Sequence, residues 1–109
     1  MVLPTAPTAP PAAILTVTAG PDTGFKFRVK PGAPTTMGRG PDNDIVLDDP
    51  ATSRRHAHIE FRDGMYVLTD LGSANGTLVN GRRVTVHGLA DGDSIQVGQN
   101  VMRTSIAAH

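Results

Sequence analysis

The chain has 109 residues, with ten basic and ten acidic side chains and a formal net charge of zero at neutral pH. This length suits one domain with a modest hydrophobic core. The balanced charge argues against a general binder of nucleic acid or of membrane surfaces, so we expect neither partner. The lack of cysteine excludes a disulfide framework and a thiolate metal site or nucleophile. We expect a cytoplasmic protein that is monomeric on its own.

The first segment, residues 1–12, contains four prolines among alanine and threonine. Proline fixes φ and removes a backbone donor, so we predict an extended, disordered tail or linker here. The segment lacks the basic start of a signal peptide. Nowhere does an apolar run approach the roughly 20 residues of a membrane helix. We therefore place the folded domain at residues 13–109 and expect no direct membrane contact.

The rest of the chain consists of short β-branched or alternating runs between glycine and proline turns. The runs predicted as strands are 14–18, 25–30, 35–39, 45–47, 57–62, 65–70, 77–79, 82–84, 94–97 and 101–106. In the second run, alternation predicts that Phe25, Phe27 and Val29 all face the core. Asp63-Gly64 is predicted to close a two-residue hairpin. Turns interrupt the chain too often for a long helix, so the pattern predicts an all-β sandwich of two sheets.

Candidate anion-binding residues lie at the end of the run 35–39 and in the segment that follows the run 45–47. Arg39 comes after Gly38 at a predicted strand end, where its planar guanidinium could bind two phosphate oxygens. Ser53 could donate its hydroxyl to the same anion, and Arg54 could add positive charge. Each of these residues alone is also typical of a solvated strand end or loop.

Two other interpretations of this region involve histidine. Ser53 and His56 could be a nucleophile and its base, but no orienting carboxylate is evident, so we expect no enzyme activity. His56 and His58 could share one face and chelate a metal. Two ligands do not make a site, however, and no third has convincing spacing, so we predict no metal or other cofactor. We expect His56 to hydrogen-bond the loop and fix its shape.

Two Asn-Gly pairs follow. The side-chain amide of Asn75 could bind the main chain of an extended peptide, although a plain turn at Asn75-Gly76 would equally account for the pair. We interpret Asn80-Gly81 as a structural turn.

In this order and at these spacings, Gly38-Arg39, Ser53-Arg54-Arg55-His56, Asn75-Gly76 and Asn80-Gly81 resemble the motifs of the forkhead-associated (FHA) domain. The flanking segments 21–27, 42–45 and 92–98 are similar to that family as well. The resemblance covers about residues 14–106. It implies an FHA/SMAD-like sandwich of about eleven strands, in agreement with the strand pattern.

The resemblance also implies roles for individual residues. Arg39 and Ser53 would bind the phosphate of a phosphothreonine peptide, Arg54 would assist, and Asn75 would bond the peptide backbone. The residues implied to support the loops and turns are Gly38, His56, Gly76, Asn80 and Gly81. The implied partner is a threonine-phosphorylated protein, such as a Ser/Thr kinase or its substrate.

One position departs from the family pattern. The residue before the Asn-Gly pair is often threonine or serine in this family, and its hydroxyl can contact the phosphate, but here it is Ala74. The phosphate has one donor fewer unless Ser73 or the backbone of Ala74 replaces it. Selectivity for neighbouring peptide residues is expected from the loop residues Pro50, Ala51, Ala74 and Arg82. Pro50 and Ala51 are uncharged, so we expect no strong selection of an acidic residue on their side.

The sequence therefore predicts a phosphothreonine-dependent interaction module in Ser/Thr kinase signalling or regulated assembly. The alternative is a phospho-independent scaffold or oligomerisation domain that uses a sheet face. A large exposed apolar patch on a sheet would favour that alternative.

Overall fold

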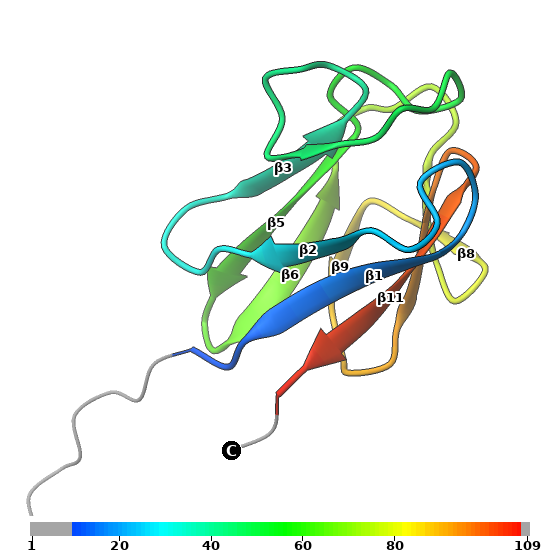
Figure 1. The fold of residues 1–109 in the computed structure, drawn as a ribbon. Coiled ribbons are helices and arrows are strands. Elements are labelled where there is room, and N and C mark those ends of the chain that lie inside the picture. The colour runs from blue at the N-terminus through cyan, green and yellow to red at the C-terminus, as the bar shows by residue number, and fades with distance from the viewer. Residues whose placement is uncertain (1–9, 108–109) are drawn as a thin grey trace, which may run out of the picture.

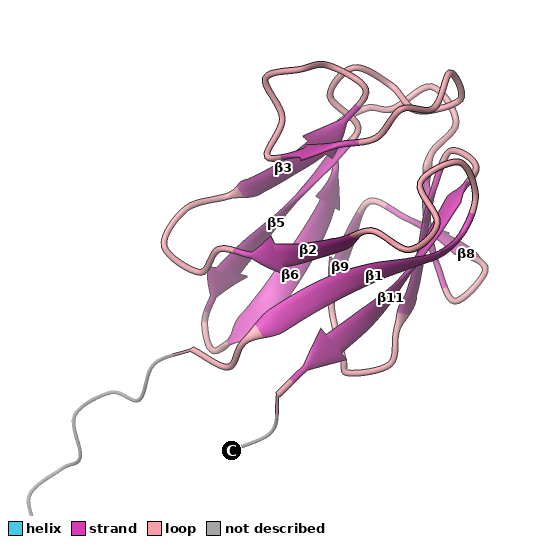
Figure 2. Ribbon diagram, in the orientation of Figure 1, coloured by secondary structure: helices cyan, strands magenta, loops and turns pink. Residues whose placement is uncertain are grey.

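The computed structural model describes residues 10–107, and these form two β-sheets without a helix (Figures 1 and 2). The strands are β1 (Ala13–Ala19), β2 (Lys26–Val29), β3 (Thr35–Gly38), β4 (Ile45–Val46), β5 (Ala57–Arg62), β6 (Met65–Asp70), β7 (Thr77–Val79), β8 (Arg82–Val84), β9 (Val86–Gly88), β10 (Ser94–Val97) and β11 (Asn100–Ile106). The predicted all-β sandwich is confirmed. Within residues 10–107, no helix is long and apolar enough to cross a membrane.

One sheet has the strand order β2-β1-β11-β10-β7-β8, and the other has the order β4-β3-β5-β6-β9. The paired strands are antiparallel, except that β3 and β4 run parallel. A parallel pair cannot be joined by a tight hairpin, so the chain makes a wider loop between β3 and β4. This connection supplies the first loop of the candidate site.

Two hairpins follow from local turn chemistry. Asp63-Gly64 joins β5 to β6 with φ values of 51° and 81°, as the sequence predicts. Asn80-Gly81 joins β7 to β8 with φ values of 52° and 82°. Two-residue hairpin turns of this kind need positive φ at both positions, which aspartate, asparagine and glycine tolerate. The second turn is also held from β10, because Ser94 N donates to Asn80 Oδ1 at 2.9 Å.

The apolar core lies between the sheets. It is built from alternate residues of the facing strands, and its fully buried side chains include Leu15, Met37, Ile59, Leu68 and Ile95. Complete burial of a side chain of this size contributes about 1.5–3 kcal/mol. Packing of the two faces therefore supplies most of the stability that holds the sandwich together.

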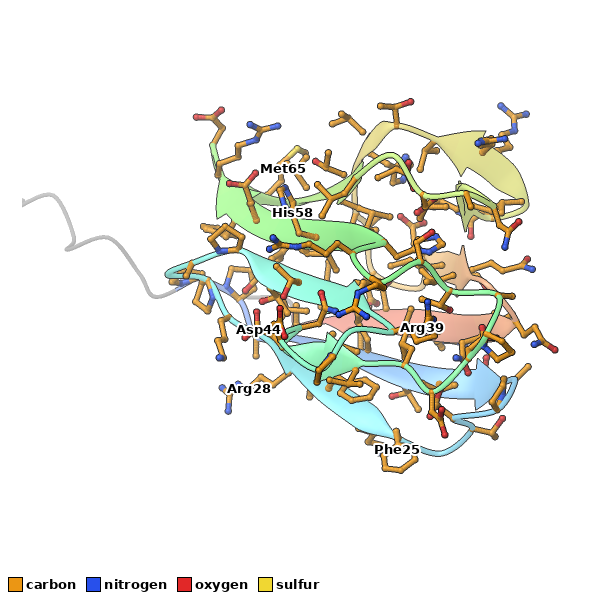
Figure 3. The ribbon with its side chains drawn as sticks, turned by 90° about the horizontal axis from the view of Figure 1, so that it is seen from above. Phe25, Arg28, Arg39, Asp44, His58 and Met65 are labelled. Carbon is orange, nitrogen blue, oxygen red and sulfur yellow. The ribbon has the colours of Figure 1, made fainter. Side chains whose placement is uncertain are left out.

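Two details of the strand prediction were wrong. The strand β9 was not predicted, because three residues that end in glycine carry little signal, and it forms by pairing with β6. Phe25 was expected in the core but is 59% exposed. It lies between the turn at residues 21–24 and β2, on the outside of the molecule (Figure 3). Its ring stacks on Phe27 with centroids 6.2 Å apart. Of the predicted trio, Val29 is buried and Phe27 is half-buried.

The described ends of the chain lie opposite the end that carries the loops after β3, β4 and β6 (Figure 1). Tyr66 donates its hydroxyl to the carbonyl of Pro11, and Ala107 N donates to the carbonyl of Ala12. The last residues of the predicted tail are therefore bonded to the domain, whereas residues 1–9 of that tail lie outside the described residues.

Candidate functional site

Three loops lie at one end of the sandwich (Figure 1). They connect β3 to β4, β4 to β5 and β6 to β7, and we refer to them as the first, second and third loops. They carry Arg39, Ser53, Arg54 and Asn75, the residues that the sequence assigned to phosphate and peptide binding. Arg39, Arg54 and Asn75 are exposed there, and no pocket is found among the described residues, so these side chains lie on an open surface. An open surface suits an extended peptide better than a small substrate that must be enclosed.

The first and second loops are bonded to each other beside the candidate phosphate site. Arg39 N donates to Ser53 O at 3.0 Å, and Gly40 N donates to Arg54 O at 3.1 Å. The side-chain amide of Asn43 donates to both Gly40 O and Arg54 O, each at 2.7 Å. These bonds fix the main chain at Arg39 relative to the main chain at Ser53.

Gly38 lies where β3 passes closest to the second loop. A Cβ atom at this position would be 2.2 Å from the carbonyl oxygen of Arg54, which is far inside van der Waals contact. Any side chain at Gly38 would push the two loops apart. The absence of a side chain at this residue is what allows the loops to pair.

Arg39 is exposed, and its side chain lies over the loops (Figure 3). Its Nε donates to the carbonyl of Thr52 at 3.3 Å. Within residues 10–107 its terminal nitrogens have no hydrogen-bond acceptor, and no salt bridge involves Arg39. A guanidinium that is held in place and lacks an anion is suited to bind phosphate oxygens in pairs.

The hydroxyl of Ser53 is oriented by the third loop. Ala74 N donates to Ser53 Oγ at 3.0 Å. This bond uses a lone pair of the oxygen, so the hydroxyl proton remains able to donate to another group. Ser53 is half-buried, and its main chain is already bonded to Arg39. The site therefore offers a hydroxyl donor on a residue whose main chain is bonded to that of Arg39.

His56 is fully buried and joins the second loop to the third. Its Nδ1 accepts from Ser53 N at 3.1 Å, and its Nε2 lies 2.9 Å from Gly76 O. The neutral ring with its proton on Nε2 satisfies both contacts. Since the ring bonds the backbone of Ser53 and not its hydroxyl, the nucleophile and base pair is not formed. His58 instead pairs with Glu60 at 3.2 Å, and the described residues contain no metal-binding group of three or more ligands.

Asp49 is the buried centre of the second loop, and the sequence analysis missed its role. Its carboxylate accepts from Ala51 N and Thr52 Oγ1, both at 2.9 Å. It also accepts from Gln99, at 2.7 Å from the main-chain nitrogen and 3.0 Å from the side chain. Gln99 belongs to the turn between β10 and β11. Asp49 therefore ties the loop that carries Ser53 to the opposite sheet.

These hydrogen bonds also keep Asp49 charged. Burial would raise the pKa of the carboxyl, but the bonds from Gln99, Ala51 and Thr52 outweigh it and hold the pKa below its ordinary value of 3.8. A sequence signal for this role does exist. An aspartate that accepts from the main chain two residues later forms an Asx turn, and Asp49-Pro50-Ala51 is such a segment.

Asn75 is exposed on the third loop. Its Nδ2 donates to the carbonyl of Ala51 at 2.7 Å, so the residue bridges the second and third loops. Within the described residues, its other amide proton and its Oδ1 make no further bond, which leaves one donor and one acceptor for the main chain of a peptide. Gly76 follows with φ of 80°, a conformation that favours glycine.

The missing hydroxyl at position 74 is not replaced by its neighbours. Ser73 is buried, and its hydroxyl donates to Asp70. The backbone nitrogen of Ala74 donates to Ser53. Both groups that the sequence offered as substitutes are therefore used inside the protein, which leaves Arg39, Ser53 and Arg54 as the predicted phosphate donors.

The remaining predicted residues occupy different places. Arg54 is exposed on the second loop, and within residues 10–107 its side chain makes no hydrogen bond or salt bridge. Ala51 lies on the same loop beside Asn75. Arg82 lies on β8, outside the three loops. The loops thus bring together all the predicted phosphate and peptide contacts, with Arg82 on the neighbouring hairpin.

A model of the FHA domain family matches residues 35–98, which is more than half of the chain and includes all three loops. This chain belongs to the FHA domain family. The eleven strands and two sheets within residues 10–107 agree with the fold that the resemblance implied.

Curated relatives and solved structures agree with this assignment. The chain is 45% identical to the glycogen accumulation regulator GarA of Mycolicibacterium smegmatis, over 81% of this chain and 55% of GarA. It is 42% identical to the oxoglutarate dehydrogenase inhibitor of Corynebacterium diphtheriae, over 81% of this chain and 61% of that protein. The chain therefore spans little more than half the length of these relatives. Mycobacterium tuberculosis EmbR, solved in complex with a low-affinity phosphopeptide, is similar with a TM-score of 0.80 and 35% identity, over 90% of this chain and 25% of EmbR.

Proposed function

We propose that this FHA domain binds a threonine-phosphorylated segment of a partner protein across the three loops. The observation that carries the proposal is that Arg39 and Ser53 lie on two loops joined by a main-chain hydrogen bond. An unpaired guanidinium and a free hydroxyl proton lie on two loops whose main chains are bonded at 3.0 Å. Membership of the FHA family and the similarity to phosphopeptide-bound EmbR support the same function.

The energetics of such a site are favourable because its parts are already ordered. A phosphate carries a charge near −2 and can accept several charge-assisted hydrogen bonds. Binding costs less when the receptor loops do not have to be ordered first. Threonine has one methyl more than serine, and its burial is worth about 0.8 kcal/mol, or roughly fourfold in affinity. We expect a phosphothreonine preference of at least this size.

We propose a binding role without catalysis, since His56 contacts the backbone of Ser53 and not its hydroxyl. The domain would recruit its partner, such as a Ser/Thr kinase or a kinase substrate, after phosphorylation. The partner could then be held in a signalling complex or in a regulated assembly. The names of the relatives, a regulator and an inhibitor, support a regulatory use of this contact.

The scaffold alternative lacks a supporting observation. Within residues 10–107, the large hydrophobic side chains that are exposed come from several strands and loops of both sheets: Ile14, Phe25, Val46, Met65, Leu71 and Val86. Single exposed hydrophobic residues are normal on soluble proteins, whereas a docking face needs a contiguous patch.

A degenerate phosphothreonine peptide library tests the proposal. Peptides retained by the domain would be titrated calorimetrically in phosphothreonine, phosphoserine and unphosphorylated forms. We expect binding of the phosphothreonine form, weaker binding of phosphoserine and none of the unphosphorylated peptide. A library that yields no ligand, or equal binding with and without the phosphate, would refute the function.

A further inference from the structure

Arg83 lies against the third loop although it belongs to β8. A Cβ atom built on Gly76 would be 2.6 Å from Arg83 Nε, 2.9 Å from Cζ and 3.2 Å from Cδ. The Arg83 side chain therefore fills the space beside Gly76 that any larger residue would occupy. Gly76 directly follows Asn75, the residue proposed to bind the peptide main chain. The guanidinium of Arg83 is thus located at the border of the proposed site.

The surface beneath Arg83 is fixed. Gly76 is buried, and its carbonyl oxygen lies 2.9 Å from His56 Nε2. Arg83 itself pairs with Leu78 across the β7–β8 hairpin. A long side chain that already rests on a rigid surface loses less rotational freedom when it forms an ion pair.

Arg83 has no anionic partner in the described part of the chain. The contacts of basic side chains with carboxylates within residues 10–107 involve Lys30, His58 and His87, and no hydrogen bond there uses the Arg83 guanidinium. Arg83 is exposed, so its five N–H donors are accessible to a ligand. Its position is defined by packing on the loop, and its charge remains unpaired.

The neighbouring Arg82 is placed differently. Alternate residues of a strand point to opposite faces, so Arg82 shares a face with Val84, which packs against the apolar core. Arg83 points to the other face and reaches Gly76. The sequence singled out Arg82 of this pair, whereas the contact with the third loop is made by Arg83.

We propose that Arg83 binds an acidic side chain, aspartate or glutamate, of the phosphorylated partner. The acidic residue would occupy one peptide position, on the side of the phosphothreonine that runs past Asn75. This inference rests on the proposed function of the loops and adds a charge preference to it. Pro50 and Ala51 are uncharged, so these two residues of the second loop add no charge preference of their own.

The test uses phosphothreonine peptides with an alanine background. Glutamate is placed in turn at each position near the phosphothreonine, and glutamine at the same position is the neutral control. Each peptide is titrated against the wild-type domain and against Arg83→Gln, Arg82→Gln and Arg28→Gln. Each variant loses one positive charge, and Arg28 lies on β2 away from Arg39 (Figure 3). Melting curves check that all variants are folded.

We expect glutamate at one position to bind about two- to fivefold more tightly than glutamine, as for an exposed ion pair. Arg83→Gln should abolish this gain without weakening the glutamine peptide by more than about twofold. Arg82→Gln and Arg28→Gln should keep the gain. The charge reversal Arg83→Glu should make lysine the preferred residue at the same position.

The outcomes separate the inference from the proposed function. The inference is overturned if phosphopeptides bind but glutamate gives no gain, if the gain survives Arg83→Gln, or if Arg82→Gln removes it instead. In those cases the loops would still bind phosphothreonine. If no phosphopeptide binds the wild-type domain, the proposed function fails, and the inference fails with it.

Discussion

The interior of this domain has two parts that are held by different interactions. Between the sheets most buried side chains are apolar, as at Leu68, although strand threonines such as Thr35 and Thr77 are buried as well. Beneath the three loops several buried side chains are polar, and each of these is bonded to loop backbone or to another loop side chain. These buried polar residues are Asn43, Asp49, Thr52 and His56.

The two parts are sensitive to different kinds of substitution. An apolar core depends on volume and tolerates swaps that conserve it. A buried hydrogen-bond network depends on which atom donates and which accepts, and a mismatch leaves a buried group unsatisfied. The core therefore sets whether the sheets pack together. The network sets where Arg39, Ser53 and Asn75 lie relative to one another.

The largest effect on stability should come from the core. Leu68→Ala removes a fully buried side chain, so we expect a loss of about 2–5 kcal/mol in the free energy of unfolding. Urea denaturation would measure it. Phosphopeptide affinity of the molecules that remain folded should be unchanged, and a weaker affinity in the folded state would break the distinction between the two parts.

A smaller loss of stability, with weaker binding, is expected from the network. Asp49→Asn keeps the shape of the side chain but sets an amide N–H₂ against donors from Ala51, Thr52 and Gln99. We expect about 1–3 kcal/mol of destabilisation, the cost of unsatisfied buried groups. Phosphopeptide affinity should also fall in the molecules that remain folded, because the second loop carries Ser53. The control is Asp48→Asn at the exposed neighbouring residue, which should change stability by less than about 0.5 kcal/mol.

Acid should also destabilise the domain, through Asp49 of the network and through two carboxylates outside it. Burial raises the pKa values of Asp49, Asp70 and Asp93, but hydrogen bonds to each carboxylate outweigh it, so all three lie below the ordinary value of 3.8. The stability they contribute is complete above that value and is lost as the pH falls through their lower folded-state pKa values. The melting temperature should drop below about pH 4, and less steeply in Asp49→Asn. Parallel curves for the two proteins would contradict the role of Asp49.

The smallest effect concerns the exposed surface of the third loop. Ala74→Thr adds the hydroxyl that the site lacks, while the backbone bond from residue 74 to Ser53 can remain. We expect phosphopeptide affinity to rise by about 0.5–1.5 kcal/mol, the contribution of one hydrogen bond. Ala74→Val has nearly the same shape without the hydroxyl and should show no gain. Equal affinities of the two variants would show that a hydroxyl at position 74 does not contribute to phosphopeptide binding.

The fold could largely be predicted from the sequence because its signals are local. Alternation identifies strands, and Asp63-Gly64 and Asn80-Gly81 specify their own hairpins. Alternation does not show where pairing begins, however. The ladder between β1 and β2 starts at Lys26, opposite Thr16, and this start leaves Phe25 outside the core.

The candidate site could be predicted only in part. Arg39, Ser53 and Asn75 stand in ordered motifs, so their residue types and spacing were informative. The bond from Asp49 to Gln99 joins residues 50 positions apart, and no local pattern reveals such a contact. Likewise, which of the two adjacent arginines on β8 contacts the third loop depends on which face of the hairpin meets Gly76.

The most direct measurement is a calorimetric titration of the tightest phosphothreonine peptide from the library into wild-type, Arg39→Ala and Arg28→Ala domains. The wild-type and Arg28→Ala domains should bind with similar affinity. Arg39→Ala should lose about 2–5 kcal/mol, as when one partner of a close charge pair is removed. Wild-type affinity in the Arg39→Ala domain would contradict the central claim that the three loops form a phosphate-binding site.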